Sequence, residues 1–453
     1  MEKTEQLSKK QIYSDILRYM MPCLIELLLA QLVSMIDMMM VGGLGTKAIN
    51  AVGVNMNPTL LLVMIFSALN VGTTALVSRA KGEGDRKKIN QIVRQALLIT
   101  GVVGVAMTAI GFILSEQLIA MMGVENADTA EMAVAYLRWR LIGVIPIGFS
   151  SAIAAALRGV GNARTAMYYN LFGNAANVLF NWLLIQGVWI FPEMKVAGAA
   201  LATSIGQTLS MVIAFAVLFK GSGEVKLDLR ERFVFDRGIF SNMITIGMPA
   251  MAEQVVFRIA MILFGRMTVS LGEVDYAAHQ ICWNILNFVL LIGQSMQMAT
   301  APITGQCVGR NDTKRAEVYN RHAFLLLFVA MTACGLMCNI FSEQLMMLFS
   351  PEPDVLKAGL PVLRIFGASL PILAVQCTYN GALQGAGDTK FNAPIFLLTT
   401  ICIRLPVAML FKDVFGWGLV GVNSASIVDQ IVRAALFYAR YKTGKWKTIK
   451  LKQ

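Results

Sequence analysis

The sequence is poor in charged residues and in histidine, and these two shortages exclude whole classes of protein. Only 15% of its 453 residues are charged and two are histidine, whereas an average soluble domain is about 25% charged. The charged residues also gather in short clusters, between which the chain stays apolar for about 20 residues at a time. This pattern excludes a soluble enzyme, a disordered chain and a nucleic-acid-binding protein, although the formal net charge is +12.

Other architectures are excluded by patterns that are missing. The apolar runs do not alternate with a period of two, as the strands of a membrane β-barrel do. The Gly-rich turns at 158–162 and 384–390 are not followed by Gly-Lys-Ser/Thr, so we expect no ATP-driven activity. His279 and His322 do not stand at metal-ligand spacing, and the seven cysteines lie in or at the ends of apolar runs. We therefore expect buried, unpaired cysteines, no cofactor, no zinc site and no enzymatic activity.

Hydrophobic residues make up 56% of the chain, and the mean hydropathy is +0.62. Each apolar run is long enough to cross a hydrocarbon core of about 30 Å as a helix. The sequence therefore predicts an all-α integral membrane fold with twelve transmembrane helices. Their expected ranges are 14–41, 50–78, 92–114, 130–156, 165–190, 196–219, 239–268, 276–307, 318–341, 357–383, 391–411 and 417–439.

The basic residues of the loops predict an orientation. Nearly all loop lysines and arginines fall on one expected side, while the loops of the other side hold Lys47, Lys195, Lys357 and Lys412. Because cytoplasmic loops carry an excess of Lys and Arg, this asymmetry predicts that both termini are cytoplasmic. The first span is expected to be retained, since no cleavage site follows it.

The chain contains an internal repeat. In one register without a gap, Met21-Pro22 superimposes on Met248-Pro249, and Ser115-Glu116-Gln117-Leu118 on Ser342-Glu343-Gln344-Leu345. We predict an N-terminal six-helix lobe at 1–220, a cytoplasmic linker at 221–238, and a C-terminal six-helix lobe with a basic tail at 239–453. Since six is even, both lobes enter the membrane the same way round, which predicts a pseudo-twofold axis along the membrane normal. Parallel repeats of this kind are typical of transporters, with the substrate site between the halves.

Several motifs keep a specific order along the chain. They are the run from Pro22 to Asp37 leading to Val41-Gly42-Gly43-Leu44-Gly45, then Gly82-Glu83-Gly84-Asp85, Arg158-Gly159-Val160-Gly161-Asn162 and its copy Gln384-Gly385-Ala386-Gly387-Asp388-Thr389-Lys390. With these motifs in this order, the sequence resembles the multidrug and toxic compound extrusion (MATE) family over nearly its whole length. The resemblance implies a monomeric, cation-coupled antiporter of the plasma membrane. Such a protein exports organic, often cationic or amphipathic, drugs and toxins by alternating access between two lobes.

One group of polar residues inside the expected spans suggests an ion site. Asp37 lies in the outer half of the first span, Asn177 and Asn181 stand one turn apart on the fifth, and Thr203 reaches the same level on the sixth. These are hard oxygen ligands suited to Na⁺, or a cage around a titratable proton. The resemblance implies the same place, because MATE proteins couple ions through a first-span Asp and polar positions of spans 5 and 6. Members thought to be proton-coupled often have a second Asp where Asn181 stands, so this sequence slightly favours Na⁺, and we expect no other metal.

A second group of residues suggests a substrate cavity or a gate. Glu26 and Glu253 are repeat mates, and each follows a proline, Pro22 or Pro249, by one turn. A proline removes a backbone hydrogen bond, so these turns are expected to bend during transport. Glu253 is also expected to pair with a basic residue, the candidates being Arg258 and Arg404. Members coupled through the second lobe carry acidic residues where Phe257 and Leu373 stand here, so an ion site in that lobe is not predicted.

One alternative function stays open at this point. A lipid-linked oligosaccharide flippase of the same superfamily would need a cationic cavity for a pyrophosphate. Convergence of Arg258, Arg266 and Arg404 on the central cavity would favour the flippase, whereas a lining that includes Glu26, Asp37 and Glu253 would favour cationic drugs.

Overall fold

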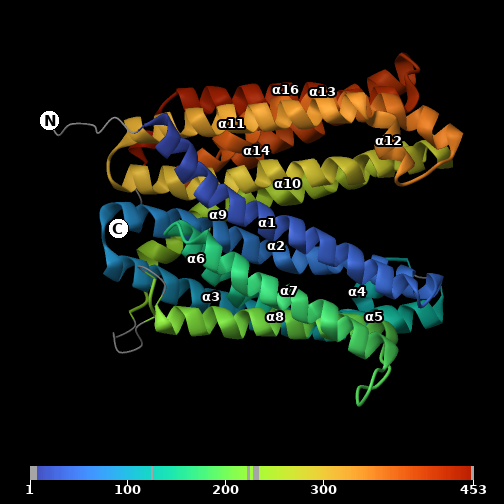
Figure 1. The fold of residues 1–453 in the computed structure, drawn as a ribbon, viewed down its shortest axis with the longest axis horizontal. Coiled ribbons are helices and arrows are strands. Elements are labelled where there is room, and N and C mark those ends of the chain that lie inside the picture. The colour runs from blue at the N-terminus through green and yellow to red at the C-terminus, as the bar shows by residue number, and fades with distance from the viewer. Residues whose placement is uncertain (1–7, 124–125, 222–224, 228–233, 450–453) are drawn as a thin grey trace. The chain divides into compact units, whose positions relative to one another are not determined.

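A computed structural model describes residues 8–123, 126–221, 225–227 and 234–449, and the residues that it describes form helices and no strand (Figure 1). The helices of the first half are α1 (Lys9–Gly42), α2 (Thr46–Glu83), α3 (Arg86–Ile113), α4 (Ser115–Ala120), α5 (Ala127–Ile142), α6 (Val144–Gly159), α7 (Ala163–Gln186) and α8 (Lys195–Lys220).

The second half repeats this order of long and short helices. It contains α9 (Arg237–Val269), α10 (Glu273–Gly309), α11 (Thr313–Ile340), α12 (Ser342–Met347), α13 (Pro353–Ala386), α14 (Asn392–Phe396), α15 (Leu405–Met409) and α16 (Gly418–Lys442). Two π-helical segments, η1 (Leu397–Arg404) and η2 (Leu410–Val414), lie around α15, and a short 3₁₀ helix, η3 (Lys445–Thr448), follows α16.

All twelve expected spans are helical. Ten of the described helical segments are long and apolar enough to cross a membrane, and the bent pair α5 and α6 forms an eleventh. The remaining one of the twelve spans is α7, which is 24 residues long. Its asparagines lower its mean hydropathy. The predicted all-α membrane fold is therefore confirmed.

The fourth span differs from its prediction because it is broken. The single helix expected at 130–156 is in fact α5 followed by α6, with a bend of 43° between them. Pro146 in the first turn of α6 lacks the N–H that would continue the hydrogen-bond ladder. Gly143 at the break packs closely on α8, since a Cβ there would lie 2.8 Å from the Ser204 Oγ.

The eleventh span is also irregular. Helix 391–411 was expected, and the structure has π-helical turns on both sides of α15. Pro406 cannot donate a backbone hydrogen bond to the preceding turn, which accounts for a local change of winding. Cysteines were expected to be buried, but Cys334 and Cys377 are half-buried and Cys402 in this span is exposed.

Local structure repeats in the register of the sequence repeat. The Asp85 side chain accepts a hydrogen bond from the Lys88 backbone N–H at 3.0 Å, at the start of α3. Asp312 accepts from the Arg315 backbone N–H at 3.0 Å, at the start of α11. Both aspartates cap a helix N-terminus in the same way, because a side-chain oxygen satisfies an N–H that has no partner within the helix.

The described chain divides into two compact units. One unit contains residues 8–24 and 248–449, and the other contains residues 25–247. Helices α1 and α9 are therefore each shared between the units, and each passes from one to the other within three residues of Pro22 or Pro249. Of the predicted linker 221–238, residues 222–224 and 228–233 lie outside the described residues.

Each unit has its own apolar core. In the first, the side chains of Ile12, Ile16 and Met20 at the start of α1 are buried among residues of α10, α11 and α13. The Tyr319 hydroxyl of α11 donates to the Asp15 carboxylate at 2.6 Å, which anchors this part of α1. In the second unit, the core lies between α2, α5 and neighbouring helices, around Leu137 and Leu141.

Candidate coupling-ion site

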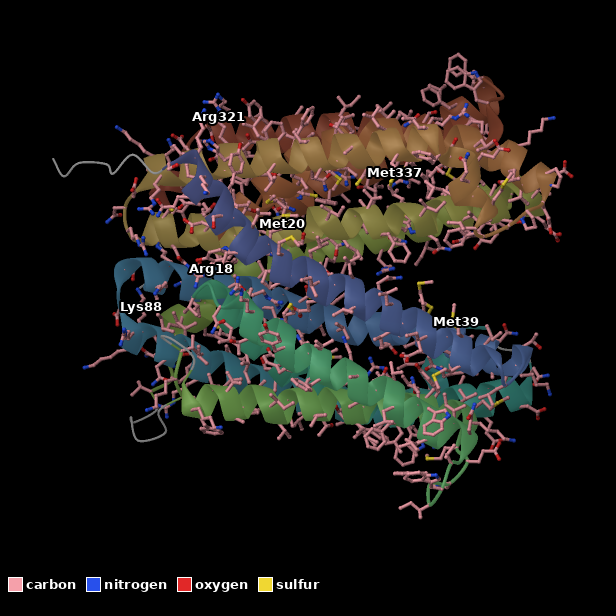
Figure 2. All side chains as sticks on the ribbon, in the orientation of Figure 1. Arg18, Met20, Met39, Lys88, Arg321 and Met337 are labelled. Atoms are coloured by element: carbon pink, nitrogen blue, oxygen red, sulfur yellow. The ribbon has the colours of Figure 1, made fainter. Side chains whose placement is uncertain are left out.

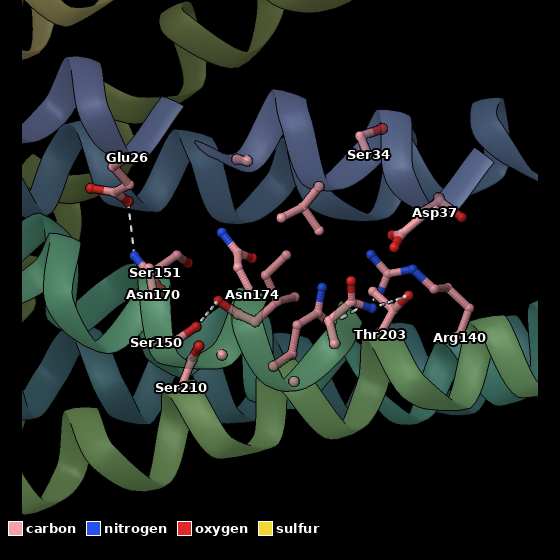
Figure 3. Close-up of a pocket in the computed structure, with 18 of the residues that line it drawn as sticks. Glu26, Ser34, Asp37, Arg140, Ser150, Ser151, Asn170, Asn174, Thr203 and Ser210 are labelled. Atoms are coloured by element: carbon pink, nitrogen blue, oxygen red, sulfur yellow. Dashed lines mark hydrogen bonds between the residues drawn. The ribbon is translucent and has the colours of Figure 1, made fainter. Parts of the chain in front are cut away.

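The unit of residues 25–247 encloses a polar pocket of about 540 Å³. Helices α1, α2, α5, α6, α7 and α8 all contribute to its walls (Figure 3). Its lining includes two carboxylates, Glu26 and Asp37, and two guanidinium groups, Arg140 and Arg158. Burial of charge in a membrane-spanning unit is costly, so charges gathered in one place suggest a functional site.

Asp37 lies at one end of this pocket with the asparagines of α7. The Asn181 side-chain amide donates a hydrogen bond to the Asp37 Oδ1. The Asn177 amide lies between the two other polar groups, one end 3.0 Å from the Asp37 Oδ1 and the other 3.1 Å from the Thr203 Oγ1. The structure thus brings together all four residues of the ion site proposed from the sequence.

The oxygen atoms of this group are suited to a small cation. Asn181 is fully buried, and its Oδ1 has no hydrogen-bond partner among the described residues. Buried polar atoms are nearly always paired, so an acceptor without a partner beside a carboxylate fits an ion that it helps to bind. A rotation of the Asn181 amide would present its carbonyl oxygen to a cation next to Asp37, and the Asn177 carbonyl faces the same place when its amide nitrogen donates to the Thr203 Oγ1.

Arg140 of α5 is a neighbour of this group that sequence reasoning missed. Its Nη1 donates to the Gln207 Oε1 at 2.8 Å, and Figure 3 shows its guanidinium directed toward Asp37. The charges of the two side chains interact, although no ion pair within 4.0 Å joins them. The missed signal was a charge inside an apolar span, the same signal that identified Asp37.

Glu26 lies at the other end of the pocket and is already paired. Its carboxylate accepts from the Arg158 Nη1 at 3.2 Å and from the Asn170 amide at 2.8 Å. Arg158 lies in the last turn of α6, and Asn170 lies in the first half of α7, which follows it. Arg158 was recognised in the sequence only as part of a motif, and its ion pair with Glu26 was not predicted.

The pairing expected for Glu253 with a basic residue is wrong. It forms no ion pair with Arg258 or Arg404 and instead accepts from the Asn392 amide at 2.9 Å and the Asn380 amide at 3.3 Å. Arg258 is exposed, while Arg404 is buried with its guanidinium 4.1 Å from the ring centroid of Phe264. An amide pair satisfies a carboxylate without a counter-charge, which is why a search for basic partners failed.

Comparison with known proteins identifies the family. The MatE family model matches the chain twice, over residues 22–183 and 249–410, in the register of the sequence repeat. The chain belongs to the MatE family. The resemblance seen in the sequence is therefore confirmed, and the chain is a carrier and not an enzyme.

MatE relatives match over nearly the full length. A probable multidrug resistance protein NorM of Thermotoga maritima is 27% identical over 447 residues, which cover 96% of this chain and 94% of the relative. A probable NorM of Streptococcus pneumoniae is 27% identical over 451 residues, 96% of each chain. The solved outward-facing structure of a MATE-family multidrug resistance transporter of the MOP superfamily has a TM-score of 0.90 at 23% identity, covering 99% of this chain and 100% of that one. The chain thus has the MatE fold.

Proposed function

We propose that this MatE protein exports organic, cationic or amphipathic drugs and toxins, driven by an inward flux of Na⁺ or H⁺. The observation that carries the proposal is the Asp37 carboxylate inside an apolar span, in hydrogen-bond contact with Asn177 and Asn181. The printed names of the relatives, which describe multidrug resistance proteins, support export of drugs.

Asp37, Asn177, Asn181 and Thr203 are the residues that would bind the coupling ion. Carboxylate, amide and hydroxyl oxygens are the ligands that a hard cation prefers. Three of these four groups are neutral and cannot take up a proton near neutral pH, so the set favours Na⁺ over H⁺. If transport were driven by protons, the uptake and release of a proton by Asp37 alone would provide the coupling.

Substrate would enter the same polar pocket from the side of Glu26. Since Arg158 neutralises Glu26, an incoming ammonium group would compete with a guanidinium that is held in place by the protein. The pocket carries both signs of charge, which suits amphipathic drugs with an amine as well as simple cations. A drug exporter is supported over an oligosaccharide flippase because Arg404, one of the three arginines a flippase cavity would need, is buried against Phe264 and does not line the pocket, whose two guanidinium groups are balanced by two carboxylates.

Alternating access would use the proline turns of α1 and α9. In each helix the proline lies where the helix passes from one compact unit to the other. A turn that lacks one backbone hydrogen bond bends at lower cost than its neighbours. We propose Pro22 and Pro249 as the hinges, in a plasma-membrane protein whose termini are both cytoplasmic.

The decisive experiment is efflux of a fluorescent organic cation from proteoliposomes under separately imposed Na⁺ and pH gradients. Asp37→Asn should retain substrate binding and lose gradient-driven efflux, because the only carboxylate of the ion site is removed. The matched control is Asp128→Asn, which removes an exposed carboxylate paired with Lys47 at 2.7 Å. Full gradient-driven efflux by Asp37→Asn would exclude the proposed coupling site.

A further inference from the structure

A second hollow, a groove of about 930 Å³, lies on the unit of residues 248–449 between α11, α13 and α16. It is lined by apolar side chains that are open to the surroundings. Leu325, Phe328, Ile431 and Tyr438 are 41%, 39%, 51% and 41% exposed. In a membrane-spanning unit the molecules that meet such a surface are lipids.

The inner wall of the groove is a row of aromatic rings in mutual contact. Phe324 lies 5.6 Å from Phe328 and 6.0 Å from Tyr379 between ring centroids. Tyr379 in turn lies 5.4 Å from Tyr438. These contacts hold the rings in fixed positions, so the groove is a formed depression and not a gap between mobile side chains.

One end of the groove carries an excess of positive charge. Glu317, Arg321 and Lys442 line that end, where α11 begins and α16 ends, and Figure 2 shows Arg321 near the start of α11. Lys447 pairs with Glu317 at 2.6 Å. Arg321 and Lys442 have no carboxylate partner among the described residues, so both are available to an anion.

The spacing of charge and apolar surface fits an amphipathic ligand. Lys442 and Ile431 are on one helix, eleven residues apart, so the apolar wall reaches about 16 Å from the charged end. Phe328 stands about two turns from Arg321 in the same direction on α11. A ligand that follows this wall has an anionic head and a hydrocarbon chain.

We propose that this groove is a binding site for an anionic phospholipid. Arg321 and Lys442 contact the headgroup phosphate, and one acyl chain lies along the aromatic wall past Phe328 and Ile431. Basic pockets between transmembrane helices at the cytoplasmic surface recognise anionic headgroups in this way. The charged end belongs to the side of the chain where the basic loops gather, which is the expected cytoplasmic side.

The test is native mass spectrometry of the purified, detergent-solubilised protein with added phosphatidylglycerol or phosphatidylcholine. The parent should bind phosphatidylglycerol in preference to the zwitterionic lipid. The double variant Arg321→Ala with Lys442→Ala should bind it roughly 10- to 30-fold more weakly, given the usual contribution of two basic residues. Arg86→Ala with Lys87→Ala removes two exposed charges from another basic turn and should leave the affinity unchanged.

A variant that keeps the charges tests the apolar wall. Ile431→Trp adds a bulky ring to the groove and should also weaken phosphatidylglycerol binding, with phosphatidylcholine binding unchanged. Equal affinity of the parent and the Arg321/Lys442 variant, or an equal loss in the Arg86/Lys87 control, would overturn the proposal. Transport need not be measured, so the result stands independently of the proposed function.

Discussion

The surroundings of Asp37 affect its carboxylate in three ways: through hydrogen bonds, through a nearby charge and through the exclusion of water. The amides of Asn177 and Asn181 satisfy its oxygens by hydrogen bonds. The Arg140 guanidinium supplies a nearby positive charge. The side chains around it exclude most of the water, which strengthens each of these interactions. We therefore expect the identity of the proposed coupling ion to depend on Asn181, and its affinity on Arg140.

Substitutions of Asn181 should separate Na⁺ from H⁺ coupling. Asn181→Asp places a second carboxylate beside Asp37, and the pair would share one proton, so transport should become dependent on the pH gradient and fall as the external medium becomes alkaline. Asn181→Ala removes an oxygen ligand and should raise the Na⁺ concentration for half-maximal transport roughly tenfold. The measurement is transport rate against Na⁺ concentration at several fixed pH values.

The control for these variants is Asn339→Ala, because among the described residues the amide of Asn339 donates within its own helix, α11, to the Gly335 carbonyl. It should reproduce the parent's curves. If Asn181→Asp and Asn181→Ala also superimposed on the parent, Asn181 would only join neighbouring helices, and the ion would bind elsewhere.

Arg140 should compete with the coupling ion. When the ion leaves, the guanidinium continues to balance the charge of Asp37, which stabilises the empty site. Arg140→Gln should therefore lower the Na⁺ concentration for half-maximal transport, by roughly tenfold for a charge at this range. Arg138→Gln is the control, because Arg138 is on the same helix but pairs with the exposed Glu116 at 2.9 Å. An unchanged Na⁺ response in Arg140→Gln would contradict this role.

At the scale of helices, the ion site depends on the close contact of α7 with α8. A Cβ added to Gly206 would lie 2.9 Å from the Asn177 Cβ. Small residues let two membrane helices approach closely, and here they set the position of Asn177, a proposed ligand. A shift of α8 would move Thr203 and Asn177 apart.

Gly206→Ala should therefore destabilise the protein by about 1–3 kcal/mol through overpacking and weaken the Na⁺ response. Gly265→Ala in α9 is the matched control, because no atom lies within 4 Å of a Cβ at that position, and it should stabilise by about 0.5–1 kcal/mol. Thermal unfolding in detergent and the Na⁺ titration measure both effects. A Gly206→Ala protein as stable and as Na⁺-responsive as Gly265→Ala would contradict the role of this contact.

The helices could be predicted from sequence because hydropathy over about 20 residues is a strong local signal. The break at Gly143 could not, since Gly143 and Pro146 lie inside one apolar run and their effect depends on contact with Ser204 of α8. The π-helical turns around Leu405 were also missed, because Pro406 marks a local irregularity in the sequence without showing which winding replaces the α-helix. Local composition shows that a span exists, while its bends depend on what packs against it.

The proximity of the candidate site residues was predictable as far as the depth of each residue in its span could be inferred from the sequence. Asp37, Asn177 and Thr203 were grouped because they stand at similar distances from the ends of their spans. Pairings between helices follow from rotation about each helix axis, which hydropathy does not give. The partners of Glu26 and Glu253 were therefore missed or wrong.

At the scale of the whole molecule, the MatE family match repeats in the register of the two halves, yet the compact units do not divide at the middle of the chain. Residues 9–24 of α1 pack with the second half, and residues 237–247 of α9 pack with the first. Each half thus contributes the start of one helix to the other. A bend at Pro22 or Pro249 would act on both units at once, because each proline lies beside a boundary between them.

The orientation of the molecule gives the last prediction. If the basic loops are cytoplasmic, a cysteine at exposed Lys226 should be closed to an impermeant thiol reagent in intact cells, and one at exposed Glu193 or Glu352 should react. The experiment uses a background in which all seven cysteines are replaced, because Cys402 is exposed. After permeabilisation all three positions should react, which controls for local accessibility. Labelling of position 226 from outside, with no reaction at 193 and 352, would invert the topology and place the charged end of the lipid groove at the outer leaflet.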